Sequence, residues 1–554
     1  MFRKFVVVLV LIAFFTVAQP GNAQLGKPFT LPIAEPPGPS TWLLGQPYGN
    51  TIGAFLQGPN WYEAGQQLHF GIDFSMPCGT ELVAVADGEV IFVDDLGFGS
   101  GPHNLLIRHP DAGLISLYGH LLERPSLSPG QWVTKGQAVA LSGDPDVTCD
   151  SRPHLHFEVR SLDYFTAYNP VDYIEANWHV LAAIGSFRYP LFQQNLDDAR
   201  TWLSLDDQPA VAFGGRALNA YSATYPDWRI GLPPANPPLN RDLPPLAETT
   251  SWTLRRFGLD GCCSGAWWHP SDPTRLYAID GSPNQRAAVF EWNVEDNTSF
   301  NLIAQAPPPL LSADGTHQVE RVDDQVVVRR LSDNTEWVVE TQNTLPSFSA
   351  DSSRLLWTIS SESGTPDDDD DTTEIWISDT SGENARMIGS RDGASAAWLD
   401  GSRLLVTIRE ETATIVGIYD TSTDISYVLG TWDRLRNMTI APGGGRLMFY
   451  VTFQDNETVN GIYIIETQPN AQPQKIDWFG AWRWRDADSV FYIPFEPAAD
   501  RQKLHYYDVT TGENRPILDE SFLIANGDWS VSPDGSRIAF WNALDMSLWL
   551  IEEG

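Results

Sequence analysis

The second half of the chain repeats itself, and this periodicity restricts the possible folds more than any other feature. Units such as FSADSSRLLWTI, WLDGSRLLVTI and VSPDGSRIAFW recur at steps of 42, 37, 49, 43, 43 and 48 residues. Repeats with a period in the forties, built from short strands, are typical of β-propellers with one four-stranded sheet per blade. We therefore expect an all-β fold in which residues 250–554 form a seven-bladed β-propeller. The aligned positions are Arg275, His317, Arg354, Arg403, Arg446, Ser489 and Arg537.

The two ends of this repeat region indicate how the ring closes. The last unit ends soon after SLWLIEEG and is one strand short, whereas TSWTLRRF (250–257) precedes the first unit. A blade shared between both ends would leave no exposed sheet edge. The units resemble the TolB-like propeller repeat, best in VSPDGSRIAF, which indicates a fold rather than a function. The run of aspartates at 367–371 is expected to be a solvated loop, with a calcium site as the alternative.

The N-terminus is typical of an exported protein. Arg3 and Lys4 precede the apolar run 5–17, and small residues follow up to Ala23. This predicts a signal peptide over 1–23, because the run is shorter than the roughly 20 residues that span a membrane; a retained anchor is the alternative. We expect a secreted or periplasmic protein of the cell envelope, with no transmembrane segment after cleavage. A proline-rich linker is expected over 24–40.

Between this linker and the propeller, a second unit is expected over 41–180. GTELVAVADGEVIFVDD alternates apolar and polar residues, and glycine turns separate further short runs, so strands are expected and no amphipathic helix. The segment 181–249 is mixed: LDDARTWLSL (196–205) could form a short helix, and GLPPANPPLNRDLPPLAE (231–248) is typical of a stiff linker.

The net charge restricts the classes of binding partner, and the cysteines bear on the cellular compartment. With a formal net charge of −36, the protein should avoid nucleic acid and anionic lipid, so substrates must be bound in local pockets. In an oxidising compartment we expect Cys78 and Cys149 to be bonded, which for a separation of 71 residues stabilises the fold by roughly 4 kcal/mol. The adjacent Cys262 and Cys263 could form a vicinal disulfide or stay reduced.

The residues that carry chemistry are concentrated in three short motifs. They are LHFGIDF with His69 and Asp73, the turn that ends in His120, and the strand HLHFEVR with His154 and His156. Because strand side chains alternate, His154 and His156 share one face. Two imidazoles and one carboxylate leave one position on zinc open for water, whose pKa the metal lowers. The remaining histidines could act as the base, and Glu158, on the face of His156, could orient it.

HFGID, PCGTELVAVADGEV, LYGHL, VTKGQAVALSG and PHLHFEVR occur in the order of the lysostaphin/LytM-type zinc endopeptidases, which this region of about 140 residues resembles. The resemblance implies one Zn²⁺ per chain, held by His69, Asp73 and His156. It also implies that His120 and His154 activate water and stabilise the oxyanion. The implied activity is hydrolysis of peptide bonds in bacterial peptidoglycan. The sequence departs from the family at Cys78 and in GDPDVTCDSR, which puts the choice of substrate in doubt.

Other interpretations remain open at this point. The histidines could be a satisfied structural cluster, or the domain could be a non-catalytic scaffold or activator of wall hydrolases. A protease acting on exported proteins is a third possibility. The propeller, whose ligand is unknown, could target the enzyme or restrict access to its cleft. His103 and His109 are expected to be structural or surface residues rather than ligands.

Overall fold

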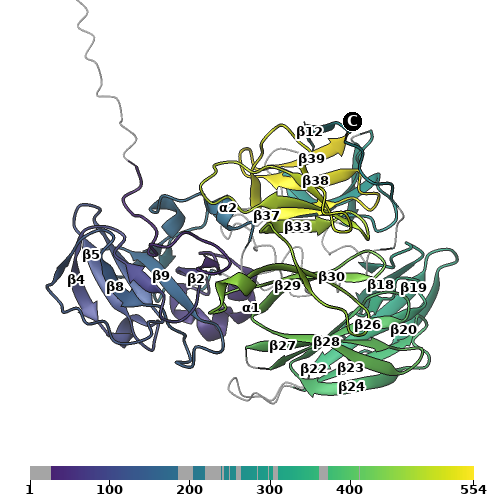
Figure 1. Cartoon of the computed structure of the whole chain (residues 1–554), viewed down its shortest axis with the longest axis horizontal. Coiled ribbons are helices and arrows are strands. Elements are labelled where there is room, and N and C mark those ends of the chain that lie inside the picture. Colours follow the sequence, from purple (N-terminus) through teal and green to yellow (C-terminus); the bar gives the residue numbers. More distant parts are fainter. Residues whose placement is uncertain are drawn as a thin grey trace, which may run out of the picture.

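The structure is a computed structural model of the full chain. It describes residues 26–184, 204–218, 239, 243–248, 250–257, 264–282, 285–296, 298–303, 310–360, 372–410 and 412–554. An N-terminal domain lies beside a ring of small sheets (Figure 1). The all-β prediction is confirmed, since strands dominate both parts and the helices are few and short.

The N-terminal domain is built on one large antiparallel sheet. Its strand order is β1-β2-β9-β6-β5-β4-β7, with β10 beside β9 and β11 beside β10. A second sheet pairs β3 with β8. The strands are β1 (Leu43–Leu44), β2 (Ile72–Ser75), β3 (Glu81–Val83), β4 (Gly88–Val93), β5 (Leu105–His109), β6 (Leu114–Gly119), β7 (Trp132–Val133), β8 (Ala138–Leu141), β9 (His154–Arg160), β10 (Thr166–Tyr168) and β11 (Val211–Ala212).

Strand β9 shows how this sheet separates its core from its polar face. Leu155, Phe157 and Val159 are completely buried in the hydrophobic core of the domain. Since successive side chains point to opposite faces of a strand, His154 and His156 must project from the other face. The alternation that forms the core therefore also presents the histidines.

Helices are more frequent in this domain than the sequence predicted. Helix α1 (Ile52–Trp61) begins at Thr51, whose side chain accepts a hydrogen bond from the Ala54 N–H, a typical N-cap. The sequence analysis looked for amphipathic helices and did not identify α1, which follows a glycine-containing stretch and shows little periodicity. The other helices in the described part of this domain are α2 (Trp178–Leu181) and the 3₁₀ turns η1 (Glu63–Gly65), η2 (Leu96–Phe98) and η3 (Pro170–Asp172), and the propeller contains the 3₁₀ turn η5 (Glu457–Val459).

The segment expected to be an exposed linker over 24–40 is, where described, part of the domain. Phe29 is completely buried and Ile33 nearly so. The Phe29 N–H donates to the Tyr173 carbonyl, and Ile33 forms an isolated bridge with Leu82. The prolines prevent regular strands here but not burial of the apolar residues between them.

The C-terminal ring contains seven four-stranded sheets, which confirms the seven-bladed propeller. Six of the seven aligned repeat positions are the first residue of the second strand in sequence of their blade, and Arg537 begins the third strand of the blade that both ends of the ring share. Blades one to three are β13 (Ser264–Trp268), β14 (Arg275–Ser282), β15 (Gln285–Asn293), β16 (Thr298–Ile303); β17 (Leu310–Leu311), β18 (His317–Val322), β19 (Gln325–Arg330), β20 (Thr335–Val339); and β21 (Ser347–Phe348), β22 (Arg354–Ser360), β23 (Thr372–Asp379), β24 (Arg386–Asp392).

The remaining blades include the one that closes the ring. Strand β12 (Trp252–Arg256) pairs with β39 in register from Trp252 opposite Glu553, so the two ends of the propeller share blade seven as predicted. Blades four to seven are β25 (Ala394–Trp398), β26 (Arg403–Glu410), β27 (Ala413–Asp420), β28 (Ile425–Asp433); β29 (Leu435–Ile440), β30 (Arg446–Val451), β31 (Gly461–Glu466), β32 (Gln474–Lys475); β33 (Gly480–Trp484), β34 (Ser489–Pro494), β35 (His505–Asp508), β36 (Asn514–Pro516); and β37 (Ile524–Val531), β38 (Arg537–Asn542), β39 (Ser547–Glu553) with β12.

The two domains are packed against each other. Leu43 and Ile184 of the N-terminal domain are buried in a hydrophobic cluster of the propeller. The Asn177 side chain donates to the Pro497 carbonyl at 3.0 Å, and the Phe453 N–H donates to the Pro39 carbonyl at 2.8 Å. These contacts fix which face of the propeller meets the N-terminal domain.

Several expectations concern residues that the structure does not describe. They are the signal peptide over 1–23, residues 196–203 of the possible short helix, most of the linker over 231–248, Cys262 and Cys263, and the aspartates at 367–371. In the part of the chain that is described, the helices are too short or too polar to cross a membrane.

Candidate active site

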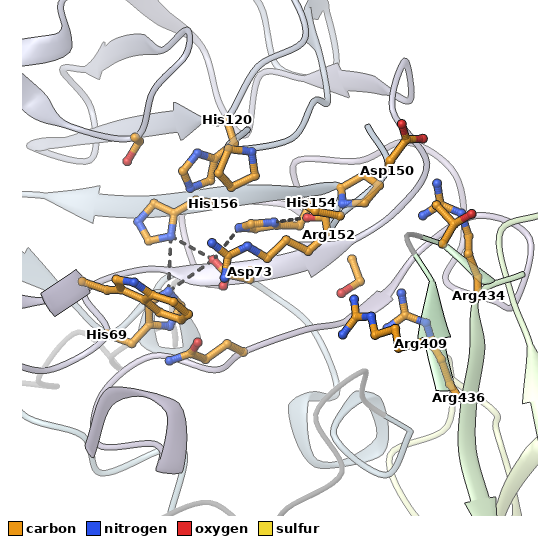
Figure 2. Close-up of a pocket in the computed structure, with 18 of the residues that line it drawn as sticks. His69, Asp73, His120, Asp150, Arg152, His154, His156, Arg409, Arg434 and Arg436 are labelled. Atoms are coloured by element: carbon orange, nitrogen blue, oxygen red, sulfur yellow. Dashed lines mark hydrogen bonds and ion pairs between the residues drawn. The ribbon is translucent and has the colours of Figure 1, made fainter. Parts of the chain in front are cut away.

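Three of the five candidate residues are placed by the pairing of two strands. In the β2–β9 pair Asp73 lies opposite His156, and Ser75 lies opposite His154. Because β9 alternates its side chains, His154 and His156 project from the same face on which Asp73 lies. Figure 2 shows these side chains gathered at one end of a pocket.

The other two histidines reach this face from loops. His69 precedes β2, and its backbone is held by a bridge to Gly49. His120 follows β6, whose Gly119 lies opposite His156, and it adopts a positive φ of 53°. The structure thus brings together all five predicted residues, named here the histidine wall: His69, Asp73, His120, His154 and His156.

Three ligand atoms form a small triangle at the centre of this wall. His69 Nε2 lies 3.2 Å from His156 Nδ1 and 3.2 Å from Asp73 Oδ1, and His156 Nδ1 lies 2.9 Å from Asp73 Oδ1. Bonds of about 2.0–2.1 Å place two ligand atoms of tetrahedral zinc roughly 3.3 Å apart. The donor set and its spacing therefore fit such a metal. No other group of this kind occurs among the described residues.

The hydrogen bonds behind the histidines fix their tautomers. Backbone carbonyls accept Nδ1–H from His69 at Pro47, from His120 at Gly101 and from His154 at Arg152. A carbonyl oxygen can only accept, so each of these rings keeps its Nε2 lone pair for the pocket. Such backing is common for metal-ligating histidines, and it also prepares a neutral imidazole to accept a proton.

His156 is held from the other side by a buried ion pair. Its Nε2 lies 3.3 Å from Glu158 Oε1, although the geometry is not that of a hydrogen bond. Glu158 is fully buried and binds the nearly buried Arg160 through two hydrogen bonds, of 2.6 and 3.1 Å. The position expected for Glu158 behind His156 is thus observed.

The electrostatics of the triangle favour a cation at its centre. Burial opposes the charged form of Asp73, but His69, His154 and His156 hold its pKa well below the usual range. Burial would also lower the pKa of His156, yet its contacts with the carboxylates of Asp73 and Glu158 raise it to about 9. A carboxylate that stays ionised and an imidazole that favours positive charge both indicate that this position suits a cation.

His120 is kept neutral. Burial and the nearby His154 and His156 lower the pKa of His120 to about 3. Its ring centre lies 4.8 Å from that of His154 and 5.8 Å from that of His156. An uncharged imidazole beside a metal site is suited to accept a proton from a bound water or substrate group.

Sequence reasoning overlooked Gly71, which lies within the first motif. A Cβ atom at this position would lie 2.5 Å from His156 Cε1 and 2.8 Å from the Phe157 carbonyl oxygen. The ring of His156 thus occupies the space that any larger residue would need. The sequence could have raised the question of why a glycine occurs in HFGID. It could not have shown that the ring of His156 packs against this glycine.

The pocket has a second wall, which comes from the propeller. The cavity has a volume of about 610 Å³ and is lined by the histidine wall on one side. On the other side lie Arg409, Arg434 and Arg436 of blades four and five, named here the arginine wall (Figure 2). No motif in the sequence connects these arginines with the histidines, and the sequence analysis did not identify them.

The disulfide between Cys78 and Cys149 is confirmed, and it lies next to the arginine wall. The Cys149 carbonyl accepts a hydrogen bond of 3.0 Å from Arg434. His103 and His109 do not line the pocket: His109 is buried between the Asp87 carbonyl and the Ser116 hydroxyl, and His103 pairs with Asp94. Their structural role is consistent with the expectation.

Comparison with known proteins places the histidine domain in a family. Residues 67–172 match the family model described as Peptidase family M23. The chain is 38% identical over 90 residues to an uncharacterized metalloprotease of Haemophilus influenzae, covering 16% of this chain and 18% of that protein. It is 28% identical over 137 residues to lysostaphin of Staphylococcus staphylolyticus, covering 24% of this chain and 27% of that protein. It is 34% identical over 123 residues to the murein hydrolase activator EnvC of Escherichia coli, covering 21% of this chain and 27% of that protein.

These alignments cover only a small part of each protein. The chain spans between 18% and 27% of the length of the three relatives, so the similarity concerns one domain rather than whole proteins. The matched segment contains every residue of the histidine wall. Residues 67–172 are therefore a peptidase M23 domain, related to that of lysostaphin and joined in this chain to a seven-bladed β-propeller.

Proposed function

We propose that this protein is a zinc-dependent endopeptidase that hydrolyses peptide bonds in bacterial peptidoglycan. The observation that carries the proposal is the triangle of His69 Nε2, Asp73 Oδ1 and His156 Nδ1, with edges of 2.9–3.2 Å. These residues would hold the metal. Zinc bound there would lower the pKa of a water molecule and polarise the scissile carbonyl.

The chain's own residues would then orient the substrate and move protons. His120 presents an uncharged Nε2 to the pocket, since its Nδ1–H is donated to Gly101, and it can accept a proton there. His154 Nε2 lies 3.7 Å from Asp73 Oδ1, at the edge of the triangle, where it can meet the opposite side of a bound peptide group. Proton transfer by such residues contributes typically about 10²–10⁴-fold in rate.

The proposed setting is the cell envelope. The N-terminal segment 1–23 has the pattern of a signal peptide, and the Cys78–Cys149 disulfide suits an oxidising compartment. Peptidoglycan lies outside the cytoplasm, so export would bring enzyme and substrate together. The propeller would bind or target the substrate, and it lines the pocket.

The test compares the mature protein with its Asp73→Ala variant on purified peptidoglycan, with new peptide ends identified by mass spectrometry. The unmodified protein should carry about one zinc ion per chain and produce new amine and carboxyl ends. Asp73→Ala should lose both zinc and activity, whereas Asp163→Ala, which removes a carboxylate outside the site, should lose neither. A zinc-loaded protein that cleaves protein substrates but not peptidoglycan would favour the alternative of a protease for exported proteins.

A second candidate function is activation of other wall hydrolases without catalysis. The similarity to the activator EnvC, 34% identical over 123 residues, favours it. Such a protein should stimulate a murein hydrolase equally well with Asp73 or with alanine at this position. Stimulation by both proteins, with no new ends from either alone, would replace the endopeptidase by an activator.

A further inference from the structure

We infer that the arginine wall is a binding site for carboxylate groups of the peptide substrate, supplied by the propeller to the peptidase pocket. The inference rests on the proposed function for the identity of the substrate, but its physical basis is independent. Arg409, Arg434 and Arg436 line the same cavity as the histidine wall. A peptide that lies across the cavity from the histidines would therefore meet these guanidinium groups.

The three arginines differ from most arginines of the propeller in having no acidic partner. Elsewhere guanidinium groups pair with carboxylates, such as Arg255 with Glu552 and Arg403 with Asp400, both within 2.7 Å. Among the described residues, none of the three forms an ion pair with an aspartate or glutamate. In a chain with a net charge of −36, three arginines facing one cavity without a carboxylate are unexpected.

The acidic groups near the arginine wall do not neutralise it. Of the carboxylates that line the cavity, Asp73 belongs to the metal triangle, and Asp150 forms no ion pair with an arginine in the described part of the chain. Glu410 follows Arg409 but binds Arg391 at 2.6 Å. The next residue, 411, lies outside the described residues.

Two of the arginines are held in place by their surroundings. Arg436 is half-buried, its Nε donates to the Thr452 hydroxyl at 3.1 Å, and its guanidinium lies 5.5 Å from the centre of the Phe453 ring. Arg434 donates to the Cys149 carbonyl at 3.0 Å. Each contact uses only part of the five N–H donors of a guanidinium, so further donors remain for a ligand.

The charges of the arginine wall also act on one another. Burial lowers the pKa of Arg436, and the neighbouring Arg434 and Arg409 lower it further, while Tyr450 opposes this effect. A half-buried, uncompensated positive charge is unfavourable until an anion arrives. Carboxylates suit this position because a guanidinium can bind both of their oxygens at once.

The peptidase side contributes a fourth arginine to the same cavity. Arg152 lies between the histidine wall and the arginine wall, with its guanidinium 4.7 Å from the centre of the Trp61 ring. Figure 2 shows it beside Asp73 and His154, opposite the propeller residues. A peptide lying across the cavity would thus meet positive charge on both sides, while its scissile bond lies at the triangle.

The test measures binding, so that it does not depend on catalysis. The full chain with His120→Ala serves as background, and the probe is the tetrapeptide Ala-Glu-Lys-Ala, titrated by calorimetry. Adding Arg409→Gln and Arg436→Gln should weaken binding about 10–100-fold, the loss typical of charged hydrogen bonds. Arg434 is left intact because it also contacts Cys149. The control Arg321→Gln removes the same charge from blade two and should change nothing.

Peptide variants identify which carboxylate is bound. A C-terminal amide tests the terminal carboxylate, glutamine in place of glutamate tests the side chain, and both changes together give a reference peptide without any carboxylate. The inference requires that this carboxylate-free peptide loses no affinity when the arginines are replaced. Equal loss for the peptides with and without carboxylates, unchanged affinity in the variants, or no binding of the carboxylate-containing peptide at millimolar concentration would each overturn it.

Two further measurements separate the alternatives. Inorganic phosphate that binds more tightly than the peptide and is not displaced by it would overturn the inference in favour of a phosphate site. Thermal unfolding checks that the variants fold, and Arg409→Gln alone, at an exposed position, provides a variant that should fold in any case. Failure of peptidoglycan cleavage by the unmodified protein would count against the proposed function and leave this binding test intact.

Discussion

The two walls of the pocket differ in how the chain assembles them. The histidine wall comes from one sheet, where strand pairing sets Asp73 opposite His156 and places His154 two residues along the same face. The arginine wall comes from the propeller, which reaches the pocket only because the two domains are packed together. The first wall depends on register within a sheet and the second on contacts between residues hundreds of positions apart in sequence.

The two walls therefore have different roles in the proposals made above: the histidine wall would carry out hydrolysis, and the arginine wall would select the peptides that bind. The histidine wall contains the five residues to which the proposed function assigns metal binding and proton transfer, and it lies within the segment that matches the M23 family model. The arginine wall lies outside that segment. We therefore expect changes in the first wall to abolish turnover and changes in the second to alter which peptides are bound.

The largest expected effect comes from His120→Ala, which tests whether the histidine wall contains separate metal and proton-transfer groups. The turnover number should fall about 10²–10⁴-fold because the neutral base is lost. Zinc content should not change, since His120 is not part of the triangle. Activity is measured on purified peptidoglycan and zinc by atomic absorption.

The matched control is His103→Ala, which removes a histidine that pairs with Asp94 outside the pocket. It should retain both zinc and turnover. If His120→Ala lost its zinc, or kept its turnover, the assignment of this residue to proton transfer would be wrong.

Removing the disulfide between Cys78 and Cys149 should have the next largest effect. This change tests the loop of the peptidase domain that contacts the arginine wall. Cys78→Ser with Cys149→Ser should lower the free energy of unfolding by about 2–5 kcal/mol, because the unfolded chain gains freedom over 71 residues. The loop at Cys149 also accepts the hydrogen bond of Arg434, so peptide binding should weaken as well.

Urea unfolding of the oxidised protein, the variant and the protein under reductant measures this effect. The variant and the reduced protein should behave alike. Equal stability of all three would show that the disulfide contributes little beyond the packing of the folded loop.

A third prediction concerns the spacing of the histidine wall. Gly71→Ala should weaken zinc binding about 10–100-fold, as expected when the orientation of a ligand is disturbed. The added methyl group would lie 2.5 Å from His156 Cε1, and the Phe157 carbonyl at 2.8 Å leaves it no alternative space. Zinc affinity is measured by competition with a chelator of known affinity.

Gly26→Ala provides the control, since no atom lies within 4 Å of a Cβ at that position. It should bind zinc as tightly as the unmodified protein. Unchanged zinc affinity in Gly71→Ala would mean that His156 can shift without leaving the metal site.

The same contrast explains how much of the molecule could be predicted from its sequence. The seven blades, the closing strand and the grouping of His69, Asp73, His120, His154 and His156 follow from local patterns. Periodicity, strand alternation and short motifs act over a few residues, so the sequence displays them directly. Helix α1 was missed because it depends on its cap at Thr51 rather than on an amphipathic pattern.

The arginine wall could not be predicted because no local pattern encodes the packing of the two domains. Leu43 looks like any apolar strand residue, yet it is buried in the propeller cluster rather than in its own domain. Arg409, Arg434 and Arg436 look like ordinary polar residues at strand ends, and only their position opposite the histidines gives them a partner. Interfaces between domains of one chain leave little signal in a single sequence.

The smallest expected effect concerns the docking of the propeller itself. His179 is buried at the interface, where its Nε2 contacts Asp206 Oδ2 at 2.7 Å and its Nδ1 accepts the Asn526 N–H at 3.4 Å. Burial alone would raise the pKa of Asp206, but the hydrogen bond from His179 holds it below the usual value. The stabilisation is therefore present above about pH 4 and is lost as the pH falls below it.

Asp206→Asn should lower the free energy of unfolding at pH 7 by less than about 1 kcal/mol, because the carboxylate is half exposed to solvent. The difference from the unmodified protein should shrink toward zero near pH 3, and it is measured by urea unfolding at both pH values. Asp111→Asn, at an exposed turn, should show no such difference.

The same Asp206→Asn variant also tests the docking of the propeller. Because His179 and Asp206 lie outside the pocket, zinc affinity should not change, while a loosened propeller should weaken binding of acidic peptides. Equal destabilisation at pH 3 and pH 7 would mean that Asp206 acts through its shape rather than through its charge, and that the position of the arginine wall does not depend on the ionised form of this hydrogen bond.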